Sequence, residues 1–470
     1  MNDWMDAEAH ADRALECYER GLWAEAEAEL RKALALNPDR PEWHFNLGLT
    51  LEAAGRDEEA IVHYERAAEL MEDETDALLA AGMIANRLGR FERGLELFAK
   101  AMKLDSRCEQ ALWGTMESHL GLGNHDEVET TYYLAQHSLE HHSARCLATM
   151  GESLLQRDQH ERAGWCFREA IRIDPNLPRV RARLGEVYAA TDQPQRAVQL
   201  YLRELRDDPG SIDTLLDYGC LLAELDRHHE AAEKFRRVLE LEPANVDAHF
   251  ELGRLAMRTL RFEQAKFEFE LVLKLDAEYP VIRLSLSEAL VKLGKLEDAR
   301  VHLREELGQA RSRMTDQRPS EDLETLGRLM LAAGLPADAA WVLELAVKDE
   351  PEDVELLRQL ALARYQAGDR TGGAAASRRV LRLDSACVVS MHNLALSALE
   401  QKRVRVAAGW VNRGLAQGRR DEGLRRLRVR IYLLWGWQLT GRLTRHLRRD
   451  GKRFYRWGRM ALRKLTTRRA

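Results

Sequence analysis

The strongest constraint on the fold is a residue pattern that returns every 34 positions along most of the chain. The stretch AGWCFREAIRIDPN at 163–176 places Ala163, Phe167, Ala170 and Pro175 at fixed offsets. The same skeleton returns at 26–39, 197–210, 231–244 and 339–352. A fixed period of 34 residues is typical of stacked helix–turn–helix pairs, none of which can bury its apolar face alone. The period therefore predicts one long array of helix pairs rather than several globular domains.

Twelve repeats fit this register. They start at 7, 41, 75, 109, 144, 178, 212, 246, 280, 320, 354 and 388. Position 8 of the repeat is small in eleven of the twelve, and position 20 is Ala or Gly in eleven. Small side chains at these positions let two antiparallel helices approach closely. Position 24 is Phe or Tyr in seven repeats, and we expect these rings to fill the space against the next repeat.

This pattern resembles the tetratricopeptide repeat family over about residues 7–418. The resemblance implies an all-α, right-handed solenoid of about twelve helix–turn–helix repeats. Repeats 1–9 occupy 7–307 and repeats 10–12 occupy 320–418. Between them, the polar segment 308–319 is interpreted as a loop or a break in the array. The chain ends in a basic amphipathic helical tail or cap at 419–470.

The sequence contains no convincing set of catalytic or metal-ligating residues. Neither Gly-Lys pair is preceded by the glycine that a phosphate-binding loop requires. The cluster His137, His141 and Cys146 offers three soft ligands, but zinc sites usually need four. The six cysteines form no CxxC pair and are expected to be reduced thiols of a cytosolic protein. We therefore expect no enzymatic activity, no metal and no cofactor.

The resemblance implies a concave surface lined by positions 2, 5, 9 and 12 of each repeat. In this chain those positions combine apolar side chains with the acids Glu42, Glu52, Asp76 and Glu117. Such a lining suits an extended or helical peptide with apolar anchors and basic flanks. Packing between repeats is the alternative explanation for each aromatic residue taken alone. The predicted groove residues are Tyr18, Phe45, Leu49, Leu79, Met83, Trp113, Phe250, Arg254 and Met257.

The tail differs in charge from the rest of the chain. From residue 419 onward, 18 Lys and Arg face 3 acids, a net charge of +15, whereas residues 1–418 carry a net charge of −21. Leucines and tryptophans at helical spacing make the tail amphipathic, which suits an anionic membrane surface. Three interpretations stay open: a cap on the last repeat, docking on a membrane or nucleic acid, and docking on acidic protein. The predicted anion-binding residues are Arg425, Arg428, Arg442, Arg445, Arg449, Arg453, Arg456, Trp435 and Trp457.

These features together predict a non-enzymatic scaffold or adaptor that binds protein partners through its concave surface and is tethered by its tail. The alternative is a regulatory or substrate-recruiting subunit of a separately encoded enzyme or of a secretion or assembly complex. The N-terminus lacks the apolar core of a signal peptide, and no apolar run is long enough to span a bilayer. We therefore expect a cytoplasmic protein that is peripheral to a membrane if the tail docks there.

Overall fold

The computed structural model describes residues 3–71, 74–313, 323–418 and 420–435. Within these ranges the regular structure consists of α-helices joined by short turns, and no β-strand occurs. The chain divides into two compact units, Met1–Pro243 and Ala244–Ala470. The predicted all-α fold is thus confirmed for the described residues.

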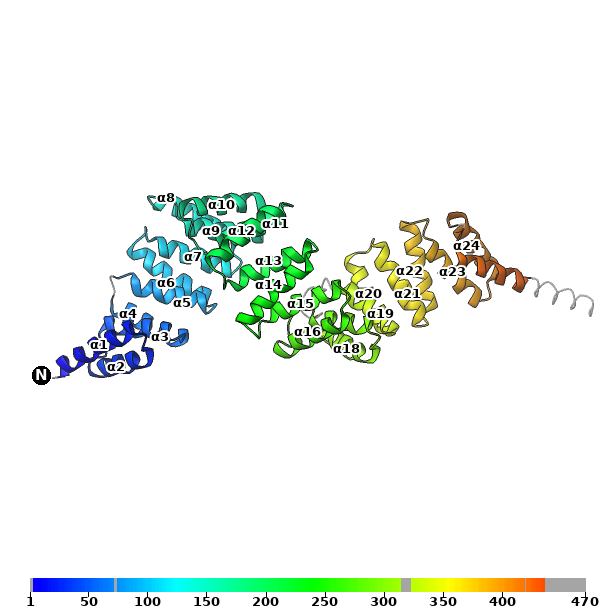
Figure 1. The fold of residues 1–470 in the computed structure, drawn as a ribbon. Coiled ribbons are helices and arrows are strands. Elements are labelled where there is room, and N and C mark those ends of the chain that lie inside the picture. Colours follow the sequence, from blue (N-terminus) through cyan, green and yellow to red (C-terminus); the bar gives the residue numbers. More distant parts are fainter. Residues whose placement is uncertain (1–2, 72–73, 314–322, 419, 436–470) are drawn as a thin grey trace, which may run out of the picture. The chain divides into compact units, whose positions relative to one another are not determined.

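The first compact unit consists of seven consecutive helix pairs (Figure 1). They are α1 (Asp3–Glu19), α2 (Trp23–Leu36), α3 (Pro41–Ala53), α4 (Asp57–Leu70), α5 (Asp76–Arg87), α6 (Phe91–Leu104), α7 (Glu109–Gly121), α8 (His125–Ser138), α9 (Ala144–Gln156), α10 (His160–Ile173), α11 (Val180–Ala190), α12 (Pro194–Asp207), α13 (Ile212–Glu224) and α14 (His228–Leu241).

The second compact unit continues the same alternation through five further helix pairs. They are α15 (Val246–Arg258), α16 (Phe262–Leu275), α17 (Ile282–Lys292), α18 (Leu296–Arg313), α19 (Leu323–Ala332), α20 (Pro336–Asp349), α21 (Val354–Gln366), α22 (Arg370–Leu383), α23 (Val388–Glu400) and α24 (Val404–Gln417). Residues 422–435 are also helical.

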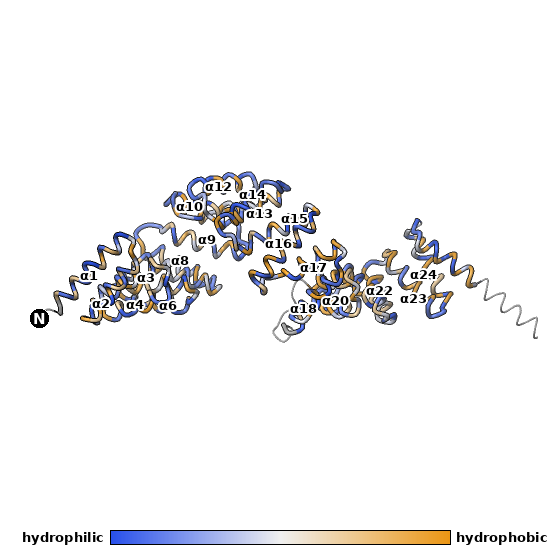
Figure 2. Tube along the Cα trace, turned by 60° about the horizontal axis from the view of Figure 1, so that its bottom comes forward, coloured by the Kyte–Doolittle hydropathy of each residue, from blue (hydrophilic) through white to orange (hydrophobic). Residues whose placement is uncertain are grey.

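The helix boundaries follow the register read from the sequence. From the second repeat onward, the first helix of each described pair begins within three residues of the predicted repeat start. The fourth repeat diverges from the pattern, with Met116 and Val128 at positions 8 and 20 in place of small residues, and it still forms a complete pair, α7 with α8. In Figure 2 apolar and polar residues alternate along the helices instead of gathering in one long stretch, as expected for helices with one buried face. Every helix of the described ranges is too short or too polar to span a lipid bilayer.

The small residue at position 8 is the site of closest approach within a repeat. A Cβ atom added to Gly82 would lie only 2.6 Å from Cε1 of Phe98, the position-24 ring of the same repeat. The ring also fills space against the next repeat, as predicted, because a Cβ atom on Gly114 would lie 2.6 Å from the same ring atom. The position-8 glycine meets the position-24 side chain in the same way at Gly48–Tyr64, Gly151–Phe167, Gly219–Phe235, Gly253–Phe269 and Gly327–Leu343.

The predicted loop at 308–319 is wrong for its first half, because α18 continues to Arg313. The reason is an apolar stripe at helical spacing. Leu303 and Leu307 are buried in the core of the second compact unit, and Ala310 packs against the same core. Each further turn of α18 therefore buries apolar surface that a loop would leave exposed. Residues 314–322 lie outside the described residues.

The described part of the tail packs on the last repeat. The Asp421 carboxylate accepts a hydrogen bond from the Leu424 backbone N–H at 2.7 Å, which caps the helix at 422–435. Leu424, Leu427 and Ile431 are buried against side chains of α23 and α24. Leu424 lies directly on Gly414, where an added Cβ atom would come within 2.5 Å of its Cδ1. These contacts support the interpretation of the first part of the tail as a cap.

Candidate functional site

A cavity of about 610 Å³ lies in the first compact unit, along the first helices of repeats 2–5. Its apolar floor contains four predicted groove residues, Phe45 from α3, Leu79 and Met83 from α5, and Trp113 from α7. These residues occupy positions 5 and 9 of consecutive repeats, so the stacking of α3, α5 and α7 brings them to one surface. Leu79 is 6% exposed and belongs to the core, whereas Phe45, Met83 and Trp113 are only half-buried.

Acidic side chains surround this floor. Glu52 accepts a hydrogen bond from the Tyr64 hydroxyl at 2.8 Å and one from Arg87 at 2.9 Å. Arg87 is held on its other side by Asp57, at 2.5 Å from its Nε, so two carboxylates already neutralise this arginine. Asp76 lies at the edge of the cavity, is exposed, and has no ion pair among the described residues. The rim of the cavity near α5 therefore has a surplus of negative charge.

A hydrogen-bonded chain fixes the indole at the other end of the cavity. Trp113 Nε1 donates to Thr149 Oγ1 at 3.1 Å, and Thr149 Oγ1 donates to Glu117 Oε1 at 2.9 Å. The Arg145 guanidinium lies over the indole, 5.0 Å from its centroid. Burial raises the pKa of Glu117, although the hydrogen bond from Thr149 opposes this effect. A cation bound in the cavity would favour the ionised form of this carboxyl.

Beyond Trp113, in repeats 6 and 7, charged side chains stand at positions 2 and 6 of the first helices, while position 5 is still apolar, as Ala182 and Leu216. Arg179 pairs with Asp213 at 2.7 Å, and Arg183 contacts Glu186 at 3.1 Å. Asp217 lies among these groups. Burial, with the nearby charge of Glu186, raises its pKa to about 6. The apolar floor of the cavity itself comes from repeats 2–4.

Two predicted groove residues lie elsewhere. Tyr18 packs edge-on against Trp23, with ring centroids 5.0 Å apart, and Leu49 packs against the core of the N-terminal repeats. Neither lines the cavity. Arg87 and Phe91 also line the cavity, from positions 13 and 17 of their repeat, and they are not among the predicted groove residues. Positions 13 and 17 are not among the groove-lining positions that the family resemblance implies. These two residues reach the cavity through the stacking of the helices, which the sequence pattern does not show.

A second cavity, of about 470 Å³, lies in the second compact unit. It contains the remaining predicted groove residues, Phe250, Arg254 and Met257, all from α15. Arg254 pairs with Glu251 at 2.7 Å, and Phe250 packs on Phe269 with ring centroids 5.8 Å apart. Phe250 is 9% exposed, so it contributes mainly to the core and little surface to this cavity.

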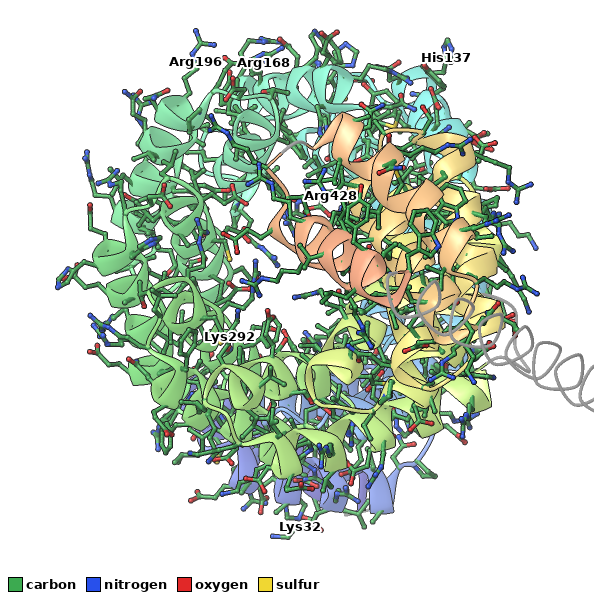
Figure 3. All side chains as sticks on the ribbon, turned by 90° about the vertical axis from the view of Figure 1, so that its right-hand side faces the viewer. Lys32, His137, Arg168, Arg196, Lys292 and Arg428 are labelled. Atoms are coloured by element: carbon green, nitrogen blue, oxygen red, sulfur yellow. The ribbon has the colours of Figure 1, made fainter. Side chains whose placement is uncertain are left out.

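The predicted anion-binding residues are only partly described. Arg425 and Arg428 are exposed on the helix at 422–435, and Figure 3 labels Arg428. Trp435 is partly buried and packs against the core of the last repeat. The other predicted residues lie outside the described residues; they are Arg442, Arg445, Arg449, Arg453, Arg456 and Trp457.

The soft-ligand cluster near 137–146 does not converge. His137 points away from its helix into solvent (Figure 3), His141 is exposed, and Cys146 is 1% exposed in the core. Among the described residues, no three His, Cys, Asp or Glu side chains gather as metal ligands would. Burial raises the pKa of the Cys146 and Cys166 thiols to about 11, which disfavours the reactive thiolate.

Several known families and proteins are similar to this chain. Models of the tetratricopeptide repeat match residues 14–55, 41–74, 181–212 and 216–280. Subunit 3 of the anaphase-promoting complex of Schizosaccharomyces pombe is 27% identical over 121 residues. That match covers 26% of this chain and 17% of the length of the relative.

Solved structures with a similar course of the chain include yeast Tom70, with a TM-score of 0.38 and 15% identity over 92% of this chain and 96% of Tom70. The Cut9–Hcn1 hetero-tetramer has a TM-score of 0.39 and 14% identity, covering 89% of this chain and 95% of the matched chain. Pseudomonas aeruginosa PilF has a TM-score of 0.33 and 17% identity, covering 53% of this chain and 97% of PilF.

The match at 41–74 has the bounds of the predicted second repeat, and the matches together reach both compact units. The helix pairs, the close glycine contacts and these matches agree on one assignment: the chain belongs to the tetratricopeptide repeat family.

Proposed function

We propose that the chain is a non-enzymatic scaffold that holds a segment of a partner protein in the cavity of the first compact unit. The observation that carries this proposal is the half-buried apolar floor of Phe45, Met83 and Trp113. Leu79, which also lines the cavity, is nearly covered and contributes mainly to the core. When a ligand covers the remaining apolar surface of the half-buried side chains, the burial of that surface from water favours binding.

The chemistry of the rim indicates which kind of segment binds. Glu52, Asp76 and Glu117 surround the floor. Of the two arginines that line the cavity, Arg87 is already neutralised by two carboxylates, and Arg145 lies over Trp113 at the other end. A segment with apolar side chains at helical or extended spacing and Lys or Arg beside them would complement both surfaces.

A random peptide library selected on the intact chain tests this proposal. Selected peptides should contain an apolar anchor, and Met83→Glu should abolish their binding while the melting temperature of the chain stays within about 2 °C of the parent. The control is Val62→Glu in α4, which introduces the same charge at an apolar residue outside the cavity that is 60% exposed and so more accessible than Met83. Retained binding by the Met83 variant would exclude this cavity as the site.

The basic tail supplies the second part of the proposed function, which is tethering to an anionic partner. Its net charge of +15 contrasts with −21 for the preceding residues. In a cytoplasmic scaffold, such a tail would place the bound partner at the anionic surface. Titrating the full chain with anionic vesicles across a salt series tests this tether, because its electrostatic part should weaken as salt rises.

The alternative function is that of a recruiting subunit in a larger assembly. The relative in S. pombe is named as a subunit of the anaphase-promoting complex. A scaffold that exchanges partners and a permanent subunit differ in stoichiometry. Purification from the native cell, followed by native mass spectrometry, would favour the subunit if the chain is found only in a complex of fixed composition.

A further inference from the structure

We infer that the outward face of the helix at 422–435 is a docking surface for an anionic lipid membrane. This inference rests on the proposed tether. It names the partner as a membrane, and it places the docking element in the capping helix rather than in residues 436–470 alone.

One face of this helix packs on the last repeat, and the other face is exposed. Leu424, Leu427 and Ile431 are at most 6% exposed and form the face that packs on α23 and α24. Because these three residues already bury the helix against the last repeat, the apolar residues on the other face are not required for capping. Their presence needs a separate explanation.

The outward face carries a small apolar strip between arginines. Val429, Tyr432 and Leu433 are 59%, 61% and 70% exposed. Tyr432 and Leu433 follow Val429 by three and four residues, so both lie beside Val429 on one side of the helix. The flanking residues Arg425, Arg426, Arg428 and Arg430 are all exposed. At 100° per residue, Arg425 and Arg428 lie on one side of the line from Val429 to Leu433, and Arg426 and Arg430 lie on the other.

An apolar strip with arginines along both edges fits a membrane surface. The strip would enter the boundary between head groups and acyl chains, while the arginine side chains extend sideways to lipid phosphates. The charge favours the same partner. Residues 420–435 contain five arginines and two acids, and residues 436–470 add twelve bases and one acid. Anionic lipid attracts such clusters at the membrane surface.

Two other occupants fit the surface less well. Duplex nucleic acid would use the arginines but would leave Val429 and Leu433 in water, since its backbone offers no apolar surface. A second copy of the helix would bring its arginines against those of the first, and like charges at such an interface repel. Lipid is the partner that would contact both the apolar strip and the arginines. The surface therefore favours lipid over duplex nucleic acid and over a second copy of the helix.

The experiment compares full-length variants by flotation with vesicles of phosphatidylcholine alone and with added phosphatidylserine. The parent should float with the anionic vesicles. The double variant Val429→Ser/Leu433→Ser should bind them about tenfold more weakly, and Arg428→Ser about fivefold more weakly at low salt. The matched control is Phe267→Ser/Val301→Ser, which removes two apolar residues of similar exposure, 59% and 54%, from other helices. It should bind as the parent does.

Each other outcome identifies what fails. If the parent floats and the Val429/Leu433 variant floats equally, the tether holds but this face is not its docking element. If the parent binds neither vesicle, the membrane tether fails as well. If the parent shifts duplex DNA instead, and the double variant shifts it equally, the partner is nucleic acid and the inference is overturned. Circular dichroism melting of all variants confirms that each one is folded.

Discussion

The ring of Phe98 in α6 occupies the space in which a side chain of Gly114 in α7 would begin. An added Cβ atom at Gly114 would lie 2.6 Å from Cε1 of Phe98, closer than carbon atoms approach without displacement. Phe98 is fully buried, so its ring has no free space into which it could move. This contact joins the third repeat to the fourth, which is the repeat that departs most from the pattern.

Gly114→Ala should therefore destabilise the chain although alanine favours helices. Overpacking of a filled site typically costs about 1–3 kcal/mol, which exceeds the helix preference of alanine over glycine, about 0.5–1 kcal/mol. The control is Gly409→Ala in α24, where an added Cβ atom meets no atom within 4 Å. Gly409→Ala should raise the free energy of unfolding. Urea unfolding measures both, and a Gly114 variant as stable as the parent would show that the ring of Phe98 can move.

The sequence predicts the helix pairs well because small and large side chains at fixed positions determine where helices touch. The glycine at position 8 and the ring at position 24 are examples, as in Gly82 with Phe98. Prediction is weaker where a residue's role depends on several helices at once. Phe91 belongs to a second helix yet lines the cavity. Leu303, Leu307 and Ala310 pack against the core of the second compact unit, and this packing extends α18 to Arg313. The polar residues and the proline of the segment 308–319 predict a loop there, because they carry no information about that core.

Asp217 predicts a dependence of stability on pH. Burial, with repulsion from Glu186, raises its pKa to about 6, and Arg183 and Arg179 offset this only in part. The folded state therefore keeps the proton to a higher pH than the unfolded chain, whose aspartates have a pKa of about 3.9. The free energy of unfolding therefore falls as pH rises from the pKa of the unfolded chain to that of the folded state. At pH 7 Asp217 is ionised in both states, and the whole cost of burying its charge destabilises the fold.

Asp217→Asn removes this penalty. It should raise the free energy of unfolding at pH 7 by about 1–3 kcal/mol, and the difference from the parent should close as pH falls to about 4. The control is Asp213→Asn, which breaks an exposed ion pair with Arg179 and should change stability by at most about 1 kcal/mol. Urea unfolding across pH measures the difference. A gap between the Asp217 variant and the parent that does not change with pH would contradict the explanation.

Substitutions on the two faces of the capping helix should affect the free energy of unfolding differently. Leu424 is fully buried on Gly414, so Leu424→Ala should lower the free energy of unfolding by about 2–5 kcal/mol. Val429 is 59% exposed on the outward face, so Val429→Ala should change it by less than about 0.5 kcal/mol. Hydrogen exchange of α23 and α24 provides the measurement, because loss of the cap should increase exchange there first. Equal effects of the two substitutions would remove the distinction between the faces.

Asp76 tests whether charge selects the ligand of the first cavity. Its carboxylate is exposed at the rim and has no ion pair among the described residues, so its reversal should disturb little of the fold. Asp76→Lys should weaken binding of a selected cationic peptide several-fold at low salt, mainly through slower association, and the effect should shrink at high salt. Glu92→Lys in α6 makes the same change in net charge at an exposed residue that does not line the cavity, and it should have a much smaller effect. Stopped-flow measurement of both variants across salt separates a local from a global effect of charge. If the two reversals weaken association equally, the peptide responds to the net charge of the chain, and Asp76 does not select it.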